Sequence, residues 1–274
     1  MTAVVAEAPI NRFEERPPAP AAKESVHPTK DFYDLAPEPA GDPSPPLHGD
    51  DDAPEIADAR DAARTATTLK ALHAALLAFD GCALKTTAKN TCPGEGPGGA
   101  PIMFVGEAPG RDEDEAGRPF VGRSGRLLER MLAAIGFSRE DVYISNVIPW
   151  RPPGNRTPST MEIATCEVFV RREIDLVAPK ILVPLGGPAS KTLLATNVGI
   201  MRQRGRWTRY PGWGAGTHMC DAIAMYHPAY LLRTPSEKRK TWQDLLALRA
   251  RLEAEHGVPP AIDAPPASDT GARP

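Results

Sequence analysis

The sequence predicts an α/β protein with a three-layer α/β/α sandwich around a central four-stranded parallel sheet. Two observations support this fold class. Four short apolar runs have the length and composition of buried strands, and amphipathic helical patterns lie between them. Strands that alternate with helices pair in parallel through right-handed crossovers, which place helices on both faces of the sheet.

The predicted strands are apolar on both faces, as expected for strands covered by helices on two sides. They comprise residues 102–105, 142–145, 181–185 and 222–225. The clearest helical pattern after the first strand, residues 123–135, places five large apolar side chains on one face and ends at Gly136. The other predicted helices are residues 67–79, 160–177, 188–195 and 237–255.

The two ends of the chain differ in composition from its middle. Residues 1–60 hold 11 of the 31 prolines, a net charge of −8 and few large apolar side chains. We therefore expect residues 1–61 to be a disordered acidic Pro-rich tail, in which residues 31–35 are a candidate motif for a protein partner. A second disordered tail is expected at residues 258–274, so that the folded domain spans residues 62–257.

Net charge is unevenly distributed along the chain. The total is −3, and the charges of −8 in residues 1–60 and −1 in residues 258–274 leave +6 for residues 61–257. A basic folded part suits a polyanionic partner such as nucleic acid. The sequence contains neither a run of about 18 apolar residues nor a signal-peptide pattern. We therefore expect a cytoplasmic monomer that does not enter a membrane.

A glycine-rich segment follows the first predicted strand. Residues 106–110 read Gly-Glu-Ala-Pro-Gly, residues 112–115 are all acidic, and residues 117–122 read Gly-Arg-Pro-Phe-Val-Gly. Glycine lets backbone approach a ligand closely, and ligands of open α/β sheets bind beyond the carboxyl ends of the strands. The segment is neither a dinucleotide fingerprint nor a Walker loop. An acidic run is commonly a solvated face, and the alternative is that it orients a catalytic water.

Polar residues also follow the second predicted strand. It ends at Asn146 and continues into a loop that carries Arg151, Arg156 and Trp150. An asparagine at this position commonly caps a turn, but its amide can also read a base edge because it both donates and accepts hydrogen bonds. The arginines suit phosphate groups and the indole offers a stacking face.

The fourth predicted strand is followed by His227. A histidine at a strand end is more often structural than functional. Here, however, it precedes Leu231 and Leu232, which form an apolar wedge, and Arg233, a cation suited to phosphate. The residue types after three of the strands therefore fit a nucleic-acid site.

These motifs resemble, in order and spacing, those of the type-4 uracil-DNA glycosylases. The resemblance extends from about residue 81 to 242. The matching segments are residues 106–110 with Glu113 and Asp114, residues 117–122, Asn146 with residues 151–156, and residues 227–233. It implies a uracil-DNA glycosylase fold and a base-excision repair hydrolase. Such an enzyme flips uracil out of single- or double-stranded DNA and excises it, which leaves an abasic site.

The resemblance implies roles for individual residues in uracil binding and catalysis. Phe120 is expected to stack on the uracil ring, and Asn146 to hydrogen-bond its Watson–Crick edge. His227 is expected near uracil O2, where it stabilises the leaving anion. Glu107, with the backbone around Ala108, is the candidate that positions the attacking water.

Further roles implied by the resemblance concern the water and the DNA. Asp114 and Glu113 are additional candidates for activating the water, because the best-known uracil glycosylases carry a catalytic aspartate where this chain has alanine. One of two leucines is expected to fill the hole left by the flipped base, and the arginines to hold phosphate. The expected DNA-binding residues are Arg151, Arg156, Leu231, Leu232 and Arg233.

Type-4 enzymes similar to this chain usually carry a [4Fe–4S] cluster on four cysteines. Cys82 and Cys166 match two of those positions, whereas Lys85 and Trp150 stand at the other two. An ammonium or an indole cannot replace a thiolate ligand. We therefore expect no metal and no other cofactor, with Trp150 and the stem of Lys85 packing in place of the cluster. The alternative is a rearranged site that recruits other cysteines.

Two other functions are compatible with the same motifs. One is a glycosylase for another deaminated base, hypoxanthine or xanthine, and the other is a DNA-binding module without catalysis that recruits partners through the N-terminal tail. The presence of Glu107, Phe120, Asn146 and His227 together favours an enzyme. The amide of Asn146 favours uracil because it complements O4 and N3–H. The basic loop of a covalent-trapping relative is absent, so no suicide adduct is expected.

Overall fold

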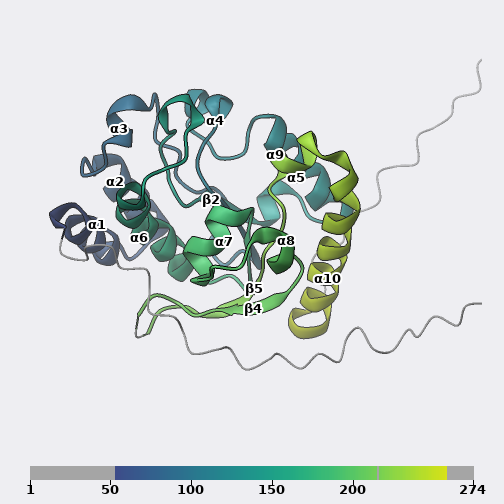
Figure 1. The fold of residues 1–274 in the computed structure, drawn as a ribbon. Coiled ribbons are helices and arrows are strands. Elements are labelled where there is room, and N and C mark those ends of the chain that lie inside the picture. Colours follow the sequence, from purple (N-terminus) through teal and green to yellow (C-terminus); the bar gives the residue numbers. More distant parts are fainter. Residues whose placement is uncertain (1–52, 215, 258–274) are drawn as a thin grey trace, which may run out of the picture. The chain divides into compact units, whose positions relative to one another are not determined.

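The computed structural model describes residues 53–214 and 216–257, which all belong to one unit of the chain (Figure 1). Within them, a five-stranded sheet has the strand order β2-β1-β3-β5-β4. Helices cover both of its faces, which confirms the predicted three-layer α/β/α class. The strands are β1 (Ile102–Gly106), β2 (Tyr143–Asn146), β3 (Ile181–Pro184), β4 (Trp207–Tyr210) and β5 (Cys220–Ile223).

The helices connect and flank the strands. Those of the first half of the chain are α1 (Pro54–Thr65), α2 (Leu69–Ala78), α3 (Leu84–Thr87), α4 (Arg111–Ala116) and α5 (Arg123–Ala134). Those of the second half are α6 (Thr160–Val177), α7 (Gly187–Leu194), α8 (Ile200–Gln203), α9 (Pro228–Arg233) and α10 (Lys238–His256). Short 3-10 turns lie at η1 (Arg139–Asp141), η2 (Pro153–Asn155) and η3 (Pro235–Glu237).

The expected sheet of four parallel strands lacked one strand. β1, β2, β3 and β5 pair in parallel, and β4 adds an antiparallel edge next to β5. Two of the four residues of β4, Thr208 and Arg209, are exposed. An edge strand with a solvated face contains no apolar run, so the pattern that predicted the other strands was missing here.

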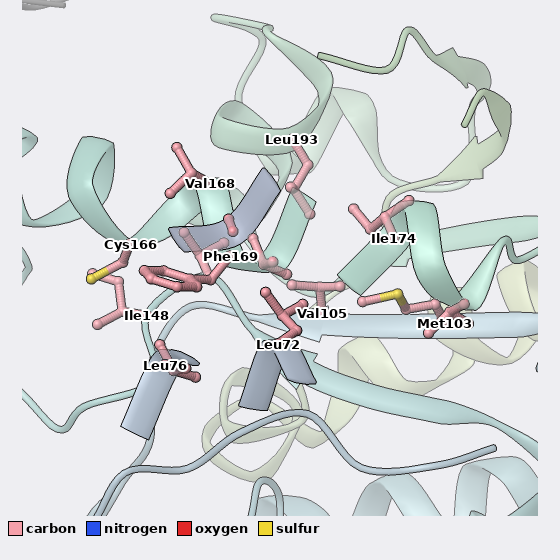
Figure 2. Close-up of a cluster of buried hydrophobic side chains, with 14 of the residues drawn as sticks. Leu72, Leu76, Met103, Val105, Ile148, Cys166, Val168, Phe169, Ile174 and Leu193 are labelled. Atoms are coloured by element: carbon pink, nitrogen blue, oxygen red, sulfur yellow. The ribbon is translucent and has the colours of Figure 1, made fainter. Parts of the chain in front are cut away.

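The side chains of β1 alternate between two hydrophobic cores. Met103 and Val105 enter a core shared with α1, α2, α6 and α7, which we call the first core. Ile102 and Phe104 enter a core shared with α5, α9 and α10, the second core. Figure 2 shows the first core, where side chains of α2 and α6 lie beside β1. Packing on both faces fixes the position of β1.

Helix α1 lies across the expected start of the folded domain at residue 62. It begins at Pro54, and its buried residues Ile56, Ala59 and Ala63 belong to the face that packs on α6. Two of these three contact residues are alanines within an acidic stretch, so the apolar period was too weak to predict a helix. The rest of the expected N-terminal tail, and the expected tail at residues 258–274, lie outside the described residues.

A buried carboxylate connects β2 to the layer of α2 and α6. Glu173 accepts hydrogen bonds from Ser145 Oγ at 2.5 Å and from the Gly94 N–H at 3.0 Å, and it lies 3.2 Å from His73 Nε2. Burial and the charge of Glu173 raise the pKa of Tyr143, which lies on β2 together with Ser145. This network fixes β2 at the residue just before its last residue, Asn146.

Among the described helices, none combines the length and the apolar character that a membrane crossing requires.

Candidate functional site

A cleft of about 600 Å³ opens at the carboxyl ends of the parallel strands. Its walls come from the segments that follow β1, β2, β3 and β5, where ligands of open α/β sheets bind. The expected site residues that line it are Glu107, Ala108, Glu113, Phe120, Asn146, Arg156, His227 and Arg233.

Asn146 and Phe120 meet over the end of β1 because Gly106 has no side chain. A Cβ at Gly106 would lie 2.4 Å from Asn146 Oδ1 and 2.7 Å from Phe120 Cζ, which is closer than van der Waals contact allows. Gly106 and Asn146 also stand opposite each other in the parallel ladder. The missing side chain therefore places an amide and an aromatic ring side by side at the floor of the cleft.

Asn146 carries an unused acceptor. Its side chain is buried, and Oδ1 has no hydrogen-bond partner among the described residues. Leaving a buried polar atom unpaired costs about 1–3 kcal/mol, so such atoms commonly mark a site that a ligand completes. The oxygen is suited to accept a hydrogen bond from an N–H group of a ligand.

Phe120 adopts an unusual backbone conformation beside this amide. Its φ of 53° lies in the left-handed region, which bulky side chains seldom occupy. The ring is buried, and its centroid lies 5.4 Å from that of His227 at an interplanar angle of 30°. Backbone strain of this kind gathers at functional sites, where the surrounding structure enforces it.

His227 presents a neutral N–H donor to the cleft. Burial, and secondarily the positive charge of Arg233, lower the pKa of His227 to about 4, so the ring is uncharged at neutral pH. Its Nδ1 accepts the N–H of Ala229 at 3.1 Å, at the N-terminus of α9. An accepting Nδ1 leaves the single ring proton on Nε2.

Two glutamates follow β1 with different surroundings. Burial raises the pKa of Glu107, which lines the cleft and makes no side-chain hydrogen bond within the described part of the chain. Glu113 uses both of its oxygens, which accept the N–H groups of Gly110 at 3.2 Å and Gly122 at 2.8 Å. Glu107 is therefore available to bind water, whereas Glu113 braces the turn.

The placement of Asp114 argues against its expected catalytic role. It lies outside the cleft, and its Oδ1 accepts the N–H groups of Lys89 at 2.8 Å and Asn90 at 3.2 Å. Its Oδ2 lies 4.0 Å from Arg151, another expected site residue that does not line the cleft. These contacts tie the segment before β1 to α4, a structural task that sequence spacing did not reveal.

The leucines expected to enter DNA pack inside the protein. Leu231 is only 1% exposed and belongs to the second core, which argues against insertion into a base stack. The partly buried Leu232 packs against the same core.

The two expected phosphate-binding arginines that line the cleft differ in their partners. Arg233 is exposed at the cleft and has no ion-pair partner in the described ranges. Arg156 pairs with Glu162 through bonds of 2.8 and 2.6 Å, which lower the pKa of Glu162 to about 2.

One wall of the cleft could not be predicted from the sequence. Met201 of α8 is 59% exposed, and its sulfur accepts a hydrogen bond from Tyr226 at 3.2 Å. Tyr226 and Tyr230 stack with centroids 5.0 Å apart. The position of the tyrosines around His227 was a usable signal, whereas the segment that holds Met201 carries no motif.

Gly186 was another missed residue. No role was predicted for the turn after β3, yet this glycine lines the cleft with a φ of 90°. A Cβ there would lie 3.2 Å from Cβ of His227. The turn therefore allows the imidazole to approach the floor of the cleft.

Comparisons with known proteins agree with this arrangement. The family model described as the uracil DNA glycosylase superfamily matches residues 93–246, which include the whole lining of the cleft. The chain is 41% identical over 167 residues to the type-4 uracil-DNA glycosylase of Archaeoglobus fulgidus, which covers 60% of this chain and 82% of that protein. The chain belongs to the type-4 uracil-DNA glycosylases.

Two further type-4 uracil-DNA glycosylases show the same level of similarity. The protein of Thermotoga maritima is 42% identical over 158 residues, or 57% of this chain and 79% of its own length. That of Pyrobaculum aerophilum is 38% identical over 183 residues, or 65% and 91%. The resemblance seen in the motifs is thus confirmed.

The four cluster positions of the type-4 family do not carry four thiols in this member. Cys82 and Cys166 are buried with their sulfurs 3.7 Å apart. Lys85 Nζ donates to two backbone carbonyls and to Asp80 Oδ1 at 2.7 Å, and the fully buried Trp150 donates its indole N–H to a threonine. This donor set does not fit a [4Fe–4S] cluster. Within the described ranges, no group of three or more His, Cys, Asp or Glu side chains is assembled that could hold a metal ion.

A titration tests the neutral state of His227 in this glycosylase. We expect its ring to take up a proton only near pH 4, because burial disfavours the charged form. The Arg233→Ala variant should raise that pKa, since it removes a nearby positive charge, whereas Arg239→Ala should not. Imidazole nitrogen shifts followed by NMR from about pH 2.5 to 8 report both values. A midpoint at the ordinary value of 6.5 would contradict the assignment.

Proposed function

We propose that the protein hydrolyses the N-glycosidic bond of uracil in DNA and leaves an abasic site. Family membership supports the activity, and the unpaired Oδ1 of Asn146 is the observation that connects it to this cleft. Uracil offers an N3–H donor next to the O4 acceptor. The amide of Asn146 complements both, because Oδ1 accepts from N3–H while Nδ2 donates to O4. Phe120 supplies the adjacent face for stacking.

His227 stabilises the leaving group in this proposal. As the bond between C1′ and N1 breaks, its electron pair moves onto uracil and negative charge develops at O2. The neutral imidazole donates its Nε2–H to that oxygen. A donor aimed at developing charge contributes roughly 10²- to 10³-fold in rate, and a neutral ring pre-set by Ala229 needs no proton uptake first.

Glu107 positions and activates the water. Burial raises its pKa above the ordinary 4.5, which makes the carboxylate a stronger acceptor for a water proton. The water oxygen bonds to C1′, the proton passes to Glu107, and uracil departs as an anion that solvent protonates. Ala108 offers no acid at the position of the usual aspartate, so the base is assigned to its neighbour.

DNA binding follows from the exposed cations at the mouth of the cleft. Arg233 is available to hold a phosphate beside the flipped nucleotide, and Arg156 reaches phosphate only by exchanging its bonds with Glu162. Residues of one chain supply every proposed role, so we propose that the protein acts on DNA as a monomer, inside the cell.

We further propose that this glycosylase works without a cluster. Lys85 and Trp150 occupy two of the four cluster positions, and their polar atoms are bound to oxygens of the protein. None of the steps assigned to Asn146, His227 and Glu107 involves these positions. The packed lysine and tryptophan then take over the local stabilisation that a cluster supplies in relatives that carry one.

Excision is tested with an oligonucleotide that contains one uracil, followed by alkaline cleavage at abasic sites. We expect uracil-dependent cleavage by the wild type. His227→Ala should lower the rate about 10²- to 10³-fold because the donor to O2 is lost. Asn146→Asp should also lower it, since a carboxylate cannot donate to O4.

The matched control is His218→Ala, which changes a histidine outside the cleft and should cleave as the wild type does. Equal rates in all variants would contradict the proposed site. A folded wild type that leaves uracil uncut would contradict the function, and oligonucleotides with hypoxanthine or xanthine would then separate the other-base alternative from a DNA-binding module.

Metal analysis tests the absence of a cluster. Protein purified without oxygen should be colourless and contain no stoichiometric iron, yet excise uracil. The Lys85→Cys/Trp150→Cys variant, which restores four thiols, serves as the positive control for iron uptake. About four irons per wild-type chain with thiolate-to-iron absorbance would overturn the proposal.

A further inference from the structure

A largely buried arginine binds the backbone of the segment that carries Phe120. Arg139 begins η1, just before β2, and its side chain is 11% exposed. Its Nη1 donates to the carbonyl oxygen of Phe120 at 2.9 Å, and its Nη2 donates to the carbonyl oxygen of Pro119. One guanidinium thus binds two consecutive carbonyls of the segment that supplies the stacking ring.

Two carboxylates hold the guanidinium in place. Glu95 and Glu129 each lie 3.4 Å from Arg139, and Glu95 also binds the exposed Arg118. The buried charge of Arg139 is therefore compensated, and its planar group is fixed between these acids and the two carbonyls.

The conformation of Phe120 explains why its carbonyl needs such a donor. The residue is in the left-handed region, and its carbonyl is pressed against α5: a Cβ at Gly125 would lie 1.7 Å from the carbonyl oxygen. Buried carbonyls require hydrogen-bond partners, and the N–H groups of a regular strand or helix do not reach this one. Gly125 provides the space and Arg139 the donors.

We propose that Arg139 is a positioning residue for uracil recognition, which holds Phe120 in its left-handed conformation and so keeps the ring facing His227 and the base. The inference rests on the proposed function. Arg139 acts only through Phe120 and touches no substrate. A lysine would carry the same charge without the planar fork that binds two carbonyls, so we expect it to replace Arg139 only in part.

A double-mutant cycle tests this route of action. The readouts are the dissociation constant of free uracil, measured by direct titration, and KM and kcat for a single-stranded uracil oligonucleotide. Phe120→Ala should weaken the binding of free uracil about tenfold because stacking is lost, and Arg139→Ala should weaken it by a similar factor. The double variant should bind as weakly as Phe120→Ala alone, because Arg139 has no effect once the ring is gone.

Three results would overturn the inference: unchanged uracil affinity in Arg139→Ala, unchanged affinity in Phe120→Ala, or effects that multiply in the double variant. Arg118→Ala is the matched control, since it removes the exposed partner of Glu95 without touching the carbonyls, and free uracil is insensitive to lost phosphate contacts. The affinity of Arg118→Ala for free uracil should equal that of the wild type.

Thermal unfolding of each variant separates positioning from loss of fold. If Arg139→Ala does not fold, Arg139→Lys takes its place, with an intermediate loss of affinity that must also vanish in the Phe120→Ala background. Wild-type protein that binds free uracil but does not excise it would contradict the proposed function and leave the cycle measurable. A cycle that fails in an active enzyme would contradict the inference alone.

Discussion

The site depends on one steric constraint, the absence of a side chain at Gly106. At that point strand β1 ends, and the amide of Asn146 and the ring of Phe120 fill the volume that a Cβ would occupy. The constraint is effective because the strand cannot move away: β1 pairs with β2 and β3 and is buried in a core on each face. Rigid packing of the sheet therefore fixes the positions of the amide and the ring, two groups that suit a flat base.

Much of this architecture could be predicted from sequence because the buried strands are apolar throughout and chemistry gathers where parallel strands end. That rule singled out Asn146 and His227, and both line the cleft. Asp114 and Leu231 show its limit, because the N–H groups that bind the Asp114 carboxylate and the side chains that bury Leu231 come from segments distant in sequence. Met201 gave no signal at all. Strand β4 and helix α1 were missed because an exposed edge and an alanine-rich face produce weak apolar periods.

Stabilisation and chemistry are separated in this fold. The positions that bind a cluster in relatives lie among residues of the first core, whereas the proposed catalytic groups line the cleft at the strand ends. Lys85 donates hydrogen bonds to two carbonyls and a carboxylate, and Trp150 is fully buried. Neighbouring segments are therefore joined by hydrogen bonds and packing. Substitution at the cluster positions can therefore leave the geometry around Asn146 unchanged.

The most direct test of this account is the affinity of Gly106→Ala for free uracil, compared with Gly98→Ala. At Gly98 a Cβ would meet only an ordinary contact at 3.8 Å from Leu69. The account predicts that Gly106→Ala is folded, with a cooperative unfolding transition. It should bind free uracil at least about tenfold more weakly than the wild type, because the ring and the amide are forced apart. Gly98→Ala should bind as the wild type does. Wild-type affinity in a folded Gly106→Ala protein would show that the contact over β1 does not build the site.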